Sequence, residues 1–427
     1  MKILFISMSP IHKGVSIGNT FLNVLEGFPD AEFSSVYTKG GAPDARVQNA
    51  FQISEKMLVK KLLHKTDTAG RRVEERGVQT DAHPDKLVTF ARKKRYTVFF
   101  WGQALLWALP YWKSDALHAF LDECKPDILF TVLSDSVPLN RLICHIQAYL
   151  QKPLVIYAWD NNYTLKMGAV SPLYRLNRHI SRIYMRATVK KAAQMYVISD
   201  VQKRDYEKAF GMPCKVLTKS ADFSGDPPVK AAYNTPLQIV FTGNISTNRW
   251  KSLAMIARAL QTVNRDGVRA QLRIYTATPL TENMRAALDI DGSSFLMGAV
   301  PASEIPHIQS DADMLVHVEA FDSKNRLAVR QSFSTKLVDY FKAARPILAV
   351  GPREVASVAH LLENDCALVA ETVGEIETAL EAVLADPGKL NDLSEKAYAC
   401  GRAHHDKAVM QQMLEADLNR VAKEGQA

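Results

Sequence analysis

Residues 332–352 read SFSTKLVDYFKAARPILAVGP, a helix pattern that runs directly into a strand pattern. A Ser-Thr pair precedes about ten residues of helical pattern, and Arg345-Pro346 then ends the helix before an apolar run. Alternation of short apolar runs with helix-length amphipathic segments is typical of α/β proteins with mostly parallel sheets. This stretch therefore predicts one helix-strand unit of a parallel sheet.

The same alternation extends along the rest of the chain. In the N-terminal half, strand patterns occupy residues 1–8, 31–38, 127–133, 153–159 and 194–199. In the C-terminal half, they occupy residues 237–242, 271–275, 294–297, 314–318, 346–350 and 367–369. The segment GDPPVKAAYN separates the two series and has the composition of a linker. The predicted fold class is therefore α/β, with two Rossmann-like doubly wound domains.

Length and spacing suggest where these domains begin and end. A chain of 427 residues is too long for one ordinary core, which agrees with two domains. We expect an N-terminal domain at 1–224 with a basic and aromatic insertion at about 55–115, a linker at 225–235 and a C-terminal domain at 236–405. Residues 406–427 are amphipathic and have no strand to pair with, so we expect a final helix there.

Composition excludes several other classes of protein. With 47% hydrophobic and 23% charged residues, the chain is a globular protein and not a disordered or fibrous one. The five cysteines lie far apart, which suggests neither a disulfide framework nor a zinc site and favours a reducing cytosol. The start MKILFISM lacks the features of a signal peptide, which counts against a periplasmic-type binding protein of similar layout. The longest apolar run, 97–112, is too short to span a bilayer, so we expect no transmembrane helix.

The start of the helix in 332–352 has features of a phosphate-binding site. Ser334 or Thr335 is expected to cap the helix and leave backbone N–H groups for a diphosphate. Lys336 would add a full positive charge, and Asp339 lies on the same helical face, where it would accept hydrogen bonds from a ribose diol. The alternative is a purely structural capped helix with a salt-bridged aspartate.

Three stretches of the C-terminal half together resemble a known family. They are VFTGNISTNR (240–249), ADMLVHVEAFD (312–322) and STKLVDYFKAARPILAVGP (334–352). They resemble the retaining family 4 glycosyltransferases, in the variant whose nucleotide-binding helix reads S-T-K-x-x-D-Y-x-x-x-x-R-P-I-L-A. The resemblance implies the GT-B fold, in which two Rossmann-like domains face a central cleft and the last helix crosses back to the N-terminal domain. It also implies transfer of a sugar from a nucleotide diphosphate sugar to an acceptor hydroxyl, with retention at the anomeric carbon.

The family assigns roles to individual residues of this chain. Asp339 corresponds to the second acid of the family's E-x7-E pair, which binds the nucleotide ribose. Basic residues that meet the diphosphate fall at Lys336 and Arg249. Glycine-bearing loops after the first strand of each domain approach the donor. The resemblance implies neither a cofactor nor a metal ion. The implied donor-binding residues are Gly14, Gly18, Gly243, Asn244, Arg249, Ser334, Thr335, Lys336 and Asp339.

The sequence departs from the family at one important position. The first acid of the E-x7-E pair falls at position 331, where this chain has Gln331. Because that acid contacts the transferred sugar, we expect a replacement, and Glu319 at the end of a strand is the candidate. Glu319 is alternatively an ordinary surface acid. In that case the chain is a degenerate transferase or a non-catalytic scaffold subunit of a polysaccharide-assembly complex. A nucleotide-sugar epimerase on the same scaffold is the nearest enzymatic alternative.

Two aspartates are candidates for the acceptor side of the cleft. Asp135 and Asp160 each follow a strand of the N-terminal half, so both should face the cleft and could orient an acceptor hydroxyl. Each could instead cap the helix that follows it. Together with Glu319, these two aspartates complete the predicted catalytic set.

The net charge of +8 is concentrated in the N-terminal half. Arg175, Arg178, Arg182, Arg186 and Lys190 recur at helical spacing in a segment with no acid. The basic run 92–95 precedes a stretch that contains Phe99, Phe100, Trp101, Trp107, Tyr111 and Trp112. Such sequence fits docking on an anionic membrane surface and a glycan or lipid-linked acceptor, whereas no nucleic-acid-binding module is present. We therefore expect a cytoplasmic protein, peripheral at the inner face of the membrane, that acts in cell-surface polysaccharide or lipid-linked glycan assembly.

Overall fold

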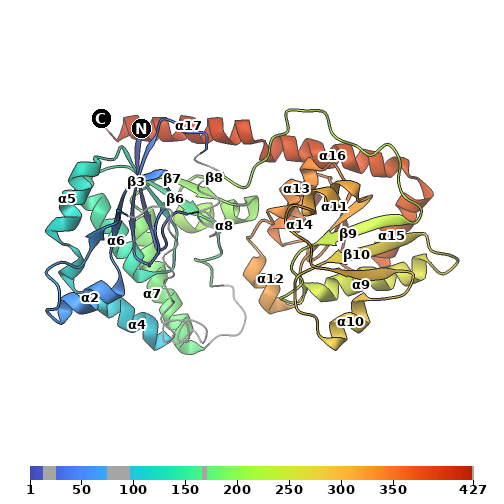
Figure 1. Cartoon of the computed structure of the whole chain (residues 1–427), viewed down its shortest axis with the longest axis horizontal. Coiled ribbons are helices and arrows are strands. Elements are labelled where there is room, and N and C mark those ends of the chain that lie inside the picture. The colour runs from blue at the N-terminus through green and yellow to red at the C-terminus, as the bar shows by residue number, and fades with distance from the viewer. Residues whose placement is uncertain (13–25, 75–96, 166–170, 426–427) are drawn as a thin grey trace.

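A computed structural model describes residues 1–12, 26–74, 97–165 and 171–425 (Figure 1). Two sheets form the centres of two layered domains. The N-terminal sheet contains β1 (Lys2–Ser7), β2 (Glu32–Tyr37), β3 (Val47–Gln52), β4 (Arg71–Arg72), β5 (Ile128–Val132), β6 (Leu154–Ala158), β7 (Ala192–Val197) and β8 (Cys214–Val216). The C-terminal sheet contains β9 (Leu237–Thr242), β10 (Ala270–Tyr275), β11 (Ser294–Gly298), β12 (Met314–Val318), β13 (Ile347–Val350) and β14 (Leu368–Ala370).

Both sheets have doubly wound topology. Their strand orders are β4-β3-β2-β1-β5-β6-β7-β8 and β11-β10-β9-β12-β13-β14, and every pairing is parallel except the one between β3 and β4. The order in which strands are added therefore changes side once in each sheet, between β1 and β5 in the first and between β9 and β12 in the second. Such switch points leave a crevice at the carboxyl edge of the sheet, where ligands bind in open α/β folds. The predicted pair of Rossmann-like doubly wound domains is confirmed.

Helices cover both faces of the two sheets. In the N-terminal domain they are α2 (Glu55–Leu62), α4 (Thr97–Leu106), the 3-10 turn η1 (Pro110–Trp112), α5 (Asp115–Cys124), α6 (Val137–Leu150), α7 (Pro172–Val189) and α8 (Asp200–Phe210). In the C-terminal domain they are α9 (Arg249–Val263), α10 (Glu282–Leu288), α11 (Ile305–Asp311), α12 (Ser323–Val329), α13 (Lys336–Lys342), α14 (Ala356–Glu363), α15 (Val373–Ala385) and α16 (Gly388–His405). The division of the chain at residues 224, 235 and 405 stays a prediction.

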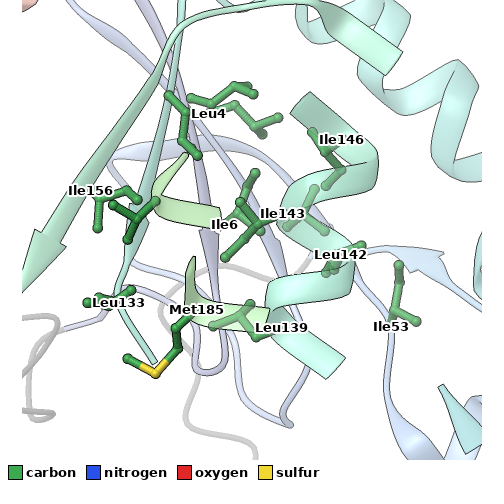
Figure 2. Close-up of a cluster of buried hydrophobic side chains, with 14 of the residues drawn as sticks. Leu4, Ile6, Ile53, Leu133, Leu139, Leu142, Ile143, Ile146, Ile156 and Met185 are labelled. Carbon is green, nitrogen blue, oxygen red and sulfur yellow. The ribbon is translucent and has the colours of Figure 1, made fainter. Parts of the chain in front are cut away.

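The N-terminal core shows why the strands were readable from the sequence. Leu4 and Ile6 alternate along β1 toward α6, whose Leu142, Ile143 and Ile146 face them (Figure 2). All five side chains are at most 1% exposed. Burial of each contributes roughly 1.5–3 kcal/mol of transfer free energy, which outweighs the weak intrinsic preferences of the backbone. The periodicity of these apolar residues therefore determines which segments become strands and helices.

The last helix, α17 (Lys407–Glu424), crosses from the C-terminal domain to the N-terminal sheet (Figure 1). Its Leu414 and Leu418 are buried against the sheet face that carries Phe5. Asp417 accepts hydrogen bonds from the Tyr196 hydroxyl at 2.9 Å and from Lys215 Nζ at 2.5 Å. This helix thus ties the two ends of the chain together.

Eleven strands lie within a few residues of their predicted positions, and three were missed. The missed strands are β3, β4 and β8. β3 reads VQNAFQ, which is too polar for a buried-strand pattern, and the other two contain two and three residues. In addition, α13 has seven residues where about ten were predicted. It ends early because Ala344 takes a left-handed backbone conformation, with φ +47°, before Arg345-Pro346.

Candidate functional site

The turn after β9 brings the first predicted site residues together. Gly243 has φ +142°, a conformation that side-chain-bearing residues rarely adopt. A Cβ atom at this position would lie 1.7 Å from Nζ of Lys336. Glycine is therefore required at 243 for two reasons, and its absence of a side chain makes the space that the Lys336 ammonium occupies. The same ammonium lies 5.2 Å from the centre of the Phe241 ring.

Next to Lys336 lies a buried ion pair between Arg249 and Glu319. Nη2 of Arg249 contacts both carboxylate oxygens, at 3.0 and 3.2 Å, and Nε contacts one of them at 3.1 Å. Burial raises the pKa of Glu319, and the charges of Arg249 and Lys336 oppose this shift. Burial and the neighbouring Arg249 lower the pKa of Lys336 to about 8. His317, which lies 3.7 Å from Glu319, is held neutral because burial lowers its pKa to about 3.

This ion pair changes how Glu319 is interpreted. The carboxylate is 3% exposed, so the alternative of an ordinary surface acid is wrong. Its oxygens point to Arg249, and Gly351 packs against its Cβ, where an added Cβ would be 2.9 Å away. The backbone oxygen of Glu319 also accepts a hydrogen bond from Ser252. Glu319 therefore holds Arg249 at the carboxyl edge of the sheet.

The predicted side-chain cap at the start of α13 is wrong. Thr335 occupies the N-cap position of α13 in a helical conformation and makes no capping hydrogen bond there. Ser334 is held through its backbone N–H, which donates to Oγ of Ser357 at 2.8 Å. Asp339, the predicted ribose ligand, is ion-paired with Lys219 at 2.6 Å, and its side chain remains 44% exposed. Lys219 was not expected from the sequence, because it lies in an irregular segment before the linker.

A pocket of about 390 Å³ opens beside Gly243 at the carboxyl edge of the C-terminal sheet. Asn244, a predicted donor ligand, lies in its wall, where Oδ1 accepts hydrogen bonds from the backbone of Ser246 and the hydroxyl of Thr278. The remaining wall comes from the segments that follow β10 and β11. The pocket and the Lys336–Arg249–Glu319 cluster thus meet at Gly243.

Gln331 makes contacts that its family position does not suggest. Its Nε2 donates to Asp205 on α8 of the N-terminal domain, and Arg330 pairs with the same carboxylate. The backbone oxygen of Gln331 accepts a hydrogen bond from Oγ of Ser199 at 2.7 Å. Gln331 is 1% exposed, so it is an interdomain contact and not an open wall of the cleft.

A cleft of about 650 Å³ lies between the two domains. Asp135 and Asp160 both line it, on the N-terminal side, and α12 lines it from the C-terminal side. Neither aspartate caps a helix at its N-terminus, since Ser136 caps α6 and no helix begins directly after Asp160. Asp135 instead pairs with Arg178 at 3.1 Å. The structure therefore brings the two aspartates together at one cleft.

Asp160 and Arg178 have unlike environments within this cleft. The Asp160 side chain is exposed to the cleft, yet the surrounding walls restrict its hydration. Partial burial and the nearby Asp135 therefore raise the pKa of Asp160. Arg178 is buried and donates to the backbone oxygens of Asn161 and Thr164 as well as to Asp135.

Two expectations about the basic and aromatic segments need correction. Arg178 does not belong to a solvated basic stripe, because it turns inward to the cleft. Trp107 and Trp112 are core residues, 0% and 3% exposed, and do not belong to an interfacial surface. Gly14, Gly18 and the basic run 92–95 lie outside the described residues. No helix of the described segments is both long and apolar enough to cross a membrane.

Comparison with solved structures places this arrangement in the GT-B fold. HepE of Anabaena, in complex with UDP, superposes with a TM-score of 0.61 at 12% identity, with 98% of this chain and 100% of that chain covered. Sucrose-phosphate synthase of Thermosynechococcus elongatus superposes with a TM-score of 0.60 at 10% identity, with 98% of each chain covered. A glycosyltransferase of Rickettsia africae gives 0.58 at 10% identity, with 99% and 98% covered. No family model and no curated protein matches the sequence.

Proposed function

We propose that this protein is a glycosyltransferase that moves a sugar from a nucleotide diphosphate sugar to an acceptor hydroxyl. The observation that carries this proposal is the Lys336 ammonium seated against Gly243, with Arg249 beside it and an open pocket adjoining. Departure of a nucleoside diphosphate requires stabilisation of the developing negative charge, and prearranged cations in a poorly hydrated site supply it. The GT-B fold, which also occurs in the glycosyltransferases compared above, agrees with this chemistry.

In the proposed donor complex, the nucleotide base occupies the pocket beside Asn244 and the ribose meets Asp339. The diphosphate then lies over the start of α13, near Ser334 and Thr335, where Lys336 and Arg249 contact it. Structures of HepE contain UDP and UDP-glucose, so uridine nucleotides are the first to test. Gly14 and Gly18 remain candidates for contacts from across the cleft. Retention, membership of family 4 and independence of metal ions follow only from the sequence motifs.

We propose that Glu319 acts mainly through Arg249, as a positioning residue. This differs from direct contact with the transferred sugar, and the Glu319→Gln variant separates the two roles. If Glu319 orients Arg249, the variant weakens binding of UDP and of UDP-glucose by the same factor. If the carboxylate contacts the sugar, UDP binding stays unchanged and only UDP-glucose binds more weakly.

The acceptor side of the proposal uses Asp135 and Asp160 in the interdomain cleft. A glycan or lipid-linked glycan enters there, and the two carboxylates orient its attacking hydroxyl. The raised pKa of Asp160 makes it the better of the two at accepting a proton from that hydroxyl. The proposed role in cell-surface polysaccharide or lipid-linked glycan assembly rests on this cleft and on the apolar surface described next.

Three neighbouring helices of the N-terminal domain, α2, α4 and α7, form a surface that fits an anionic membrane (Figure 1). Besides the buried Arg178, their sequences contain six Lys and Arg residues and one acid, Glu55, which lines the cleft. Apolar side chains between basic ones fit insertion into the headgroup region of an anionic bilayer. The exposed large apolar side chains of this surface are Val59, Leu62, Leu63, Phe99, Leu105, Leu173, Leu176 and Ile183.

Vesicle cosedimentation tests the α2–α4–α7 surface. We expect wild-type protein to bind phosphatidylglycerol vesicles more strongly than phosphatidylcholine vesicles, and the double variant L176D/I183D to lose most of that binding. Val268→Asp is the matched control, since Val268 is similarly exposed but belongs to the C-terminal domain. Equal binding by wild type and L176D/I183D would exclude this surface.

Nucleotide-dependent thermal stabilisation tests the donor site. We expect one nucleotide diphosphate to stabilise the wild-type protein and Asp339→Ala to lose most of the shift. Lys219→Met is the informative partner, because it frees Asp339 from its ion pair and should preserve or increase the shift. A folded wild-type protein that responds to no nucleotide would contradict the donor-site assignment. The alternative of a non-catalytic scaffold subunit, which Gln331 supports, would then be favoured. An epimerase would not be, since it also binds a nucleotide sugar.

A further inference from the structure

The contact between Gln331 and Asp205 joins the segment before the donor helix to the N-terminal domain. Arg330 and Gln331 precede α13 by a few residues, and both bind the Asp205 carboxylate on α8. Ser199, at the start of the same helix, donates to the backbone oxygen of Gln331. Three hydrogen bonds, made by two residues of the opposite domain, thus hold two consecutive residues.

The other side of this segment is fixed to its own domain. The backbone oxygen of Arg330 accepts a hydrogen bond from Ala356 at the start of α14. The next residue of α14, Ser357, accepts from the backbone N–H of Ser334. The helices α8 and α14 also touch directly, since Val201 packs against a pair of alanines on α14. The segment 330–334 therefore lies clamped between the two domains, directly before Lys336.

The chemistry of position 331 depends on this neighbour. Because the Asp205 carboxylate can only accept hydrogen bonds when ionised, the residue opposite it must donate. The Gln331 amide donates, whereas a glutamate at this buried position would place a second carboxylate at hydrogen-bonding distance from the partly exposed Asp205. Like charges so close disfavour ionisation of both groups or separate them.

We infer that Asp205, Arg330 and Gln331 are positioning residues that couple the donor helix to the orientation of the N-terminal domain. In this protein, Gln331 makes an interdomain contact that an acid at the same position would break, so it is more than the loss of a sugar-binding acid. The inference builds on the proposed donor site, because the coupled segment ends at that site. Domain closure that tightens the Asp205 contact also sets the position of Lys336 against the leaving diphosphate.

A charge-swap cycle tests the coupling. Gln331→Glu opposes two carboxylates, Asp205→Asn removes one, and the double variant restores a carboxylate–amide pair with the roles exchanged. We expect Gln331→Glu to raise the donor KM about tenfold, and the double variant to return to within about threefold of wild type, which is the non-additivity expected of contacting residues. Small-angle scattering should show a larger radius of gyration for Gln331→Glu alone.

Glu363→Gln is the matched control from the same interface. Glu363 on α14 pairs with Arg204 on α8 at 3.4 Å, but both side chains are at least half exposed. An exposed pair of this kind contributes little to stability. We therefore expect Glu363→Gln to keep the donor KM within about twofold of wild type and to leave the radius of gyration unchanged. An equal effect of Glu363→Gln would show that any change at this interface acts nonspecifically and would overturn the inference.

Two further outcomes would overturn the coupling. If Gln331→Glu retains or exceeds wild-type activity, the side chain at 331 serves the sugar and not Asp205. If Asp205→Asn fails to rescue Gln331→Glu in scattering and in KM, the two residues are not coupled. Absence of nucleotide binding by the wild type would contradict the proposed function instead, and the scattering cycle would still report on the contact.

Discussion

The two domains present opposite kinds of site, which we call the donor wall and the acceptor wall. On the C-terminal side, two cations and one carboxylate, Lys336, Arg249 and Glu319, are largely buried and contact one another or a glycine. On the N-terminal side, two carboxylates and one guanidinium line an open cavity, where the Asp135 side chain is 47% exposed. One wall is prearranged and net positive in these groups, whereas the other is more open and net negative.

This difference matches the proposed division of labour. A diphosphate carries its charge wherever it binds, so a fixed positive site can be built before the ligand arrives. An acceptor hydroxyl becomes anionic only as it reacts, so the site that orients it needs no net positive charge before the acceptor binds. We therefore expect substitutions on the donor wall to affect ligand binding strongly, and substitutions on the acceptor wall to affect turnover with little effect on nucleotide binding.

The largest expected effect comes from Gly243→Ala. The new methyl group would coincide with the Lys336 ammonium, and the backbone at φ +142° would be strained as well. We expect UDP affinity measured by calorimetry to fall at least about 100-fold, because Lys336 must leave its place beside the diphosphate.

Gly267→Ala separates the two causes. Gly267 has a nearly equal φ of +136°, but an added Cβ would meet nothing within 4 Å. This variant should lose thermal stability to a comparable extent and keep wild-type affinity for UDP. A comparable loss of affinity in both variants would mean that backbone strain, and not displacement of Lys336, explains the effect.

The second largest effect is expected in the pH dependence of donor binding. With its pKa near 8, Lys336 is mostly protonated at pH 7 and mostly neutral at pH 9. Because the diphosphate binds the protonated form, UDP-glucose affinity should fall about tenfold over that range. The free energy of unfolding of the unliganded protein should instead rise between pH 8 and 10.5. In this range Lys336 has lost its proton in the folded protein but keeps it in the unfolded chain.

Lys336→Met provides the control for both trends. In this variant UDP-glucose should bind weakly, with only the ligand's own titration left in the profile. The rise of stability with pH in the same window should also become smaller. A wild-type affinity that is constant from pH 7 to 9 would mean that Lys336 does not contact the diphosphate.

The positions of strands could be predicted from the sequence, whereas the partners of site residues could not. Apolar periodicity located β9 to β14 and placed Glu319 at the carboxyl end of β12, whereas Gly243 came from the family resemblance. The partner of Glu319 was not readable, because pairing with Arg249 depends on how two loops meet in space. Loops far apart in the chain leave no periodic pattern.

Arg178 and Asp205 show a second limit. Helical spacing placed Arg178 on a face with four other basic residues, but spacing does not tell which part of that face is covered. The acid Asp205 lies among charged residues of α8 and looks like any solvated side chain until Gln331 is brought to it. Interdomain contacts depend on the arrangement of two folded units, so local sequence does not encode them in a readable form.

The smallest expected effect, on the acceptor wall, separates Asp160 from Asp135. Asp160→Asn removes the carboxylate with the raised pKa and should lower kcat about tenfold, less than a full general-base contribution because Asp135 remains to orient the hydroxyl, while UDP affinity stays within about twofold. Asp135→Asn, whose partner Arg178 keeps two backbone acceptors, should change kcat by about threefold or less. Initial rates with saturating donor and calorimetry with UDP measure both quantities. Loss of UDP affinity in either variant would contradict a division between the two walls, because it would place an N-terminal carboxylate in the donor site.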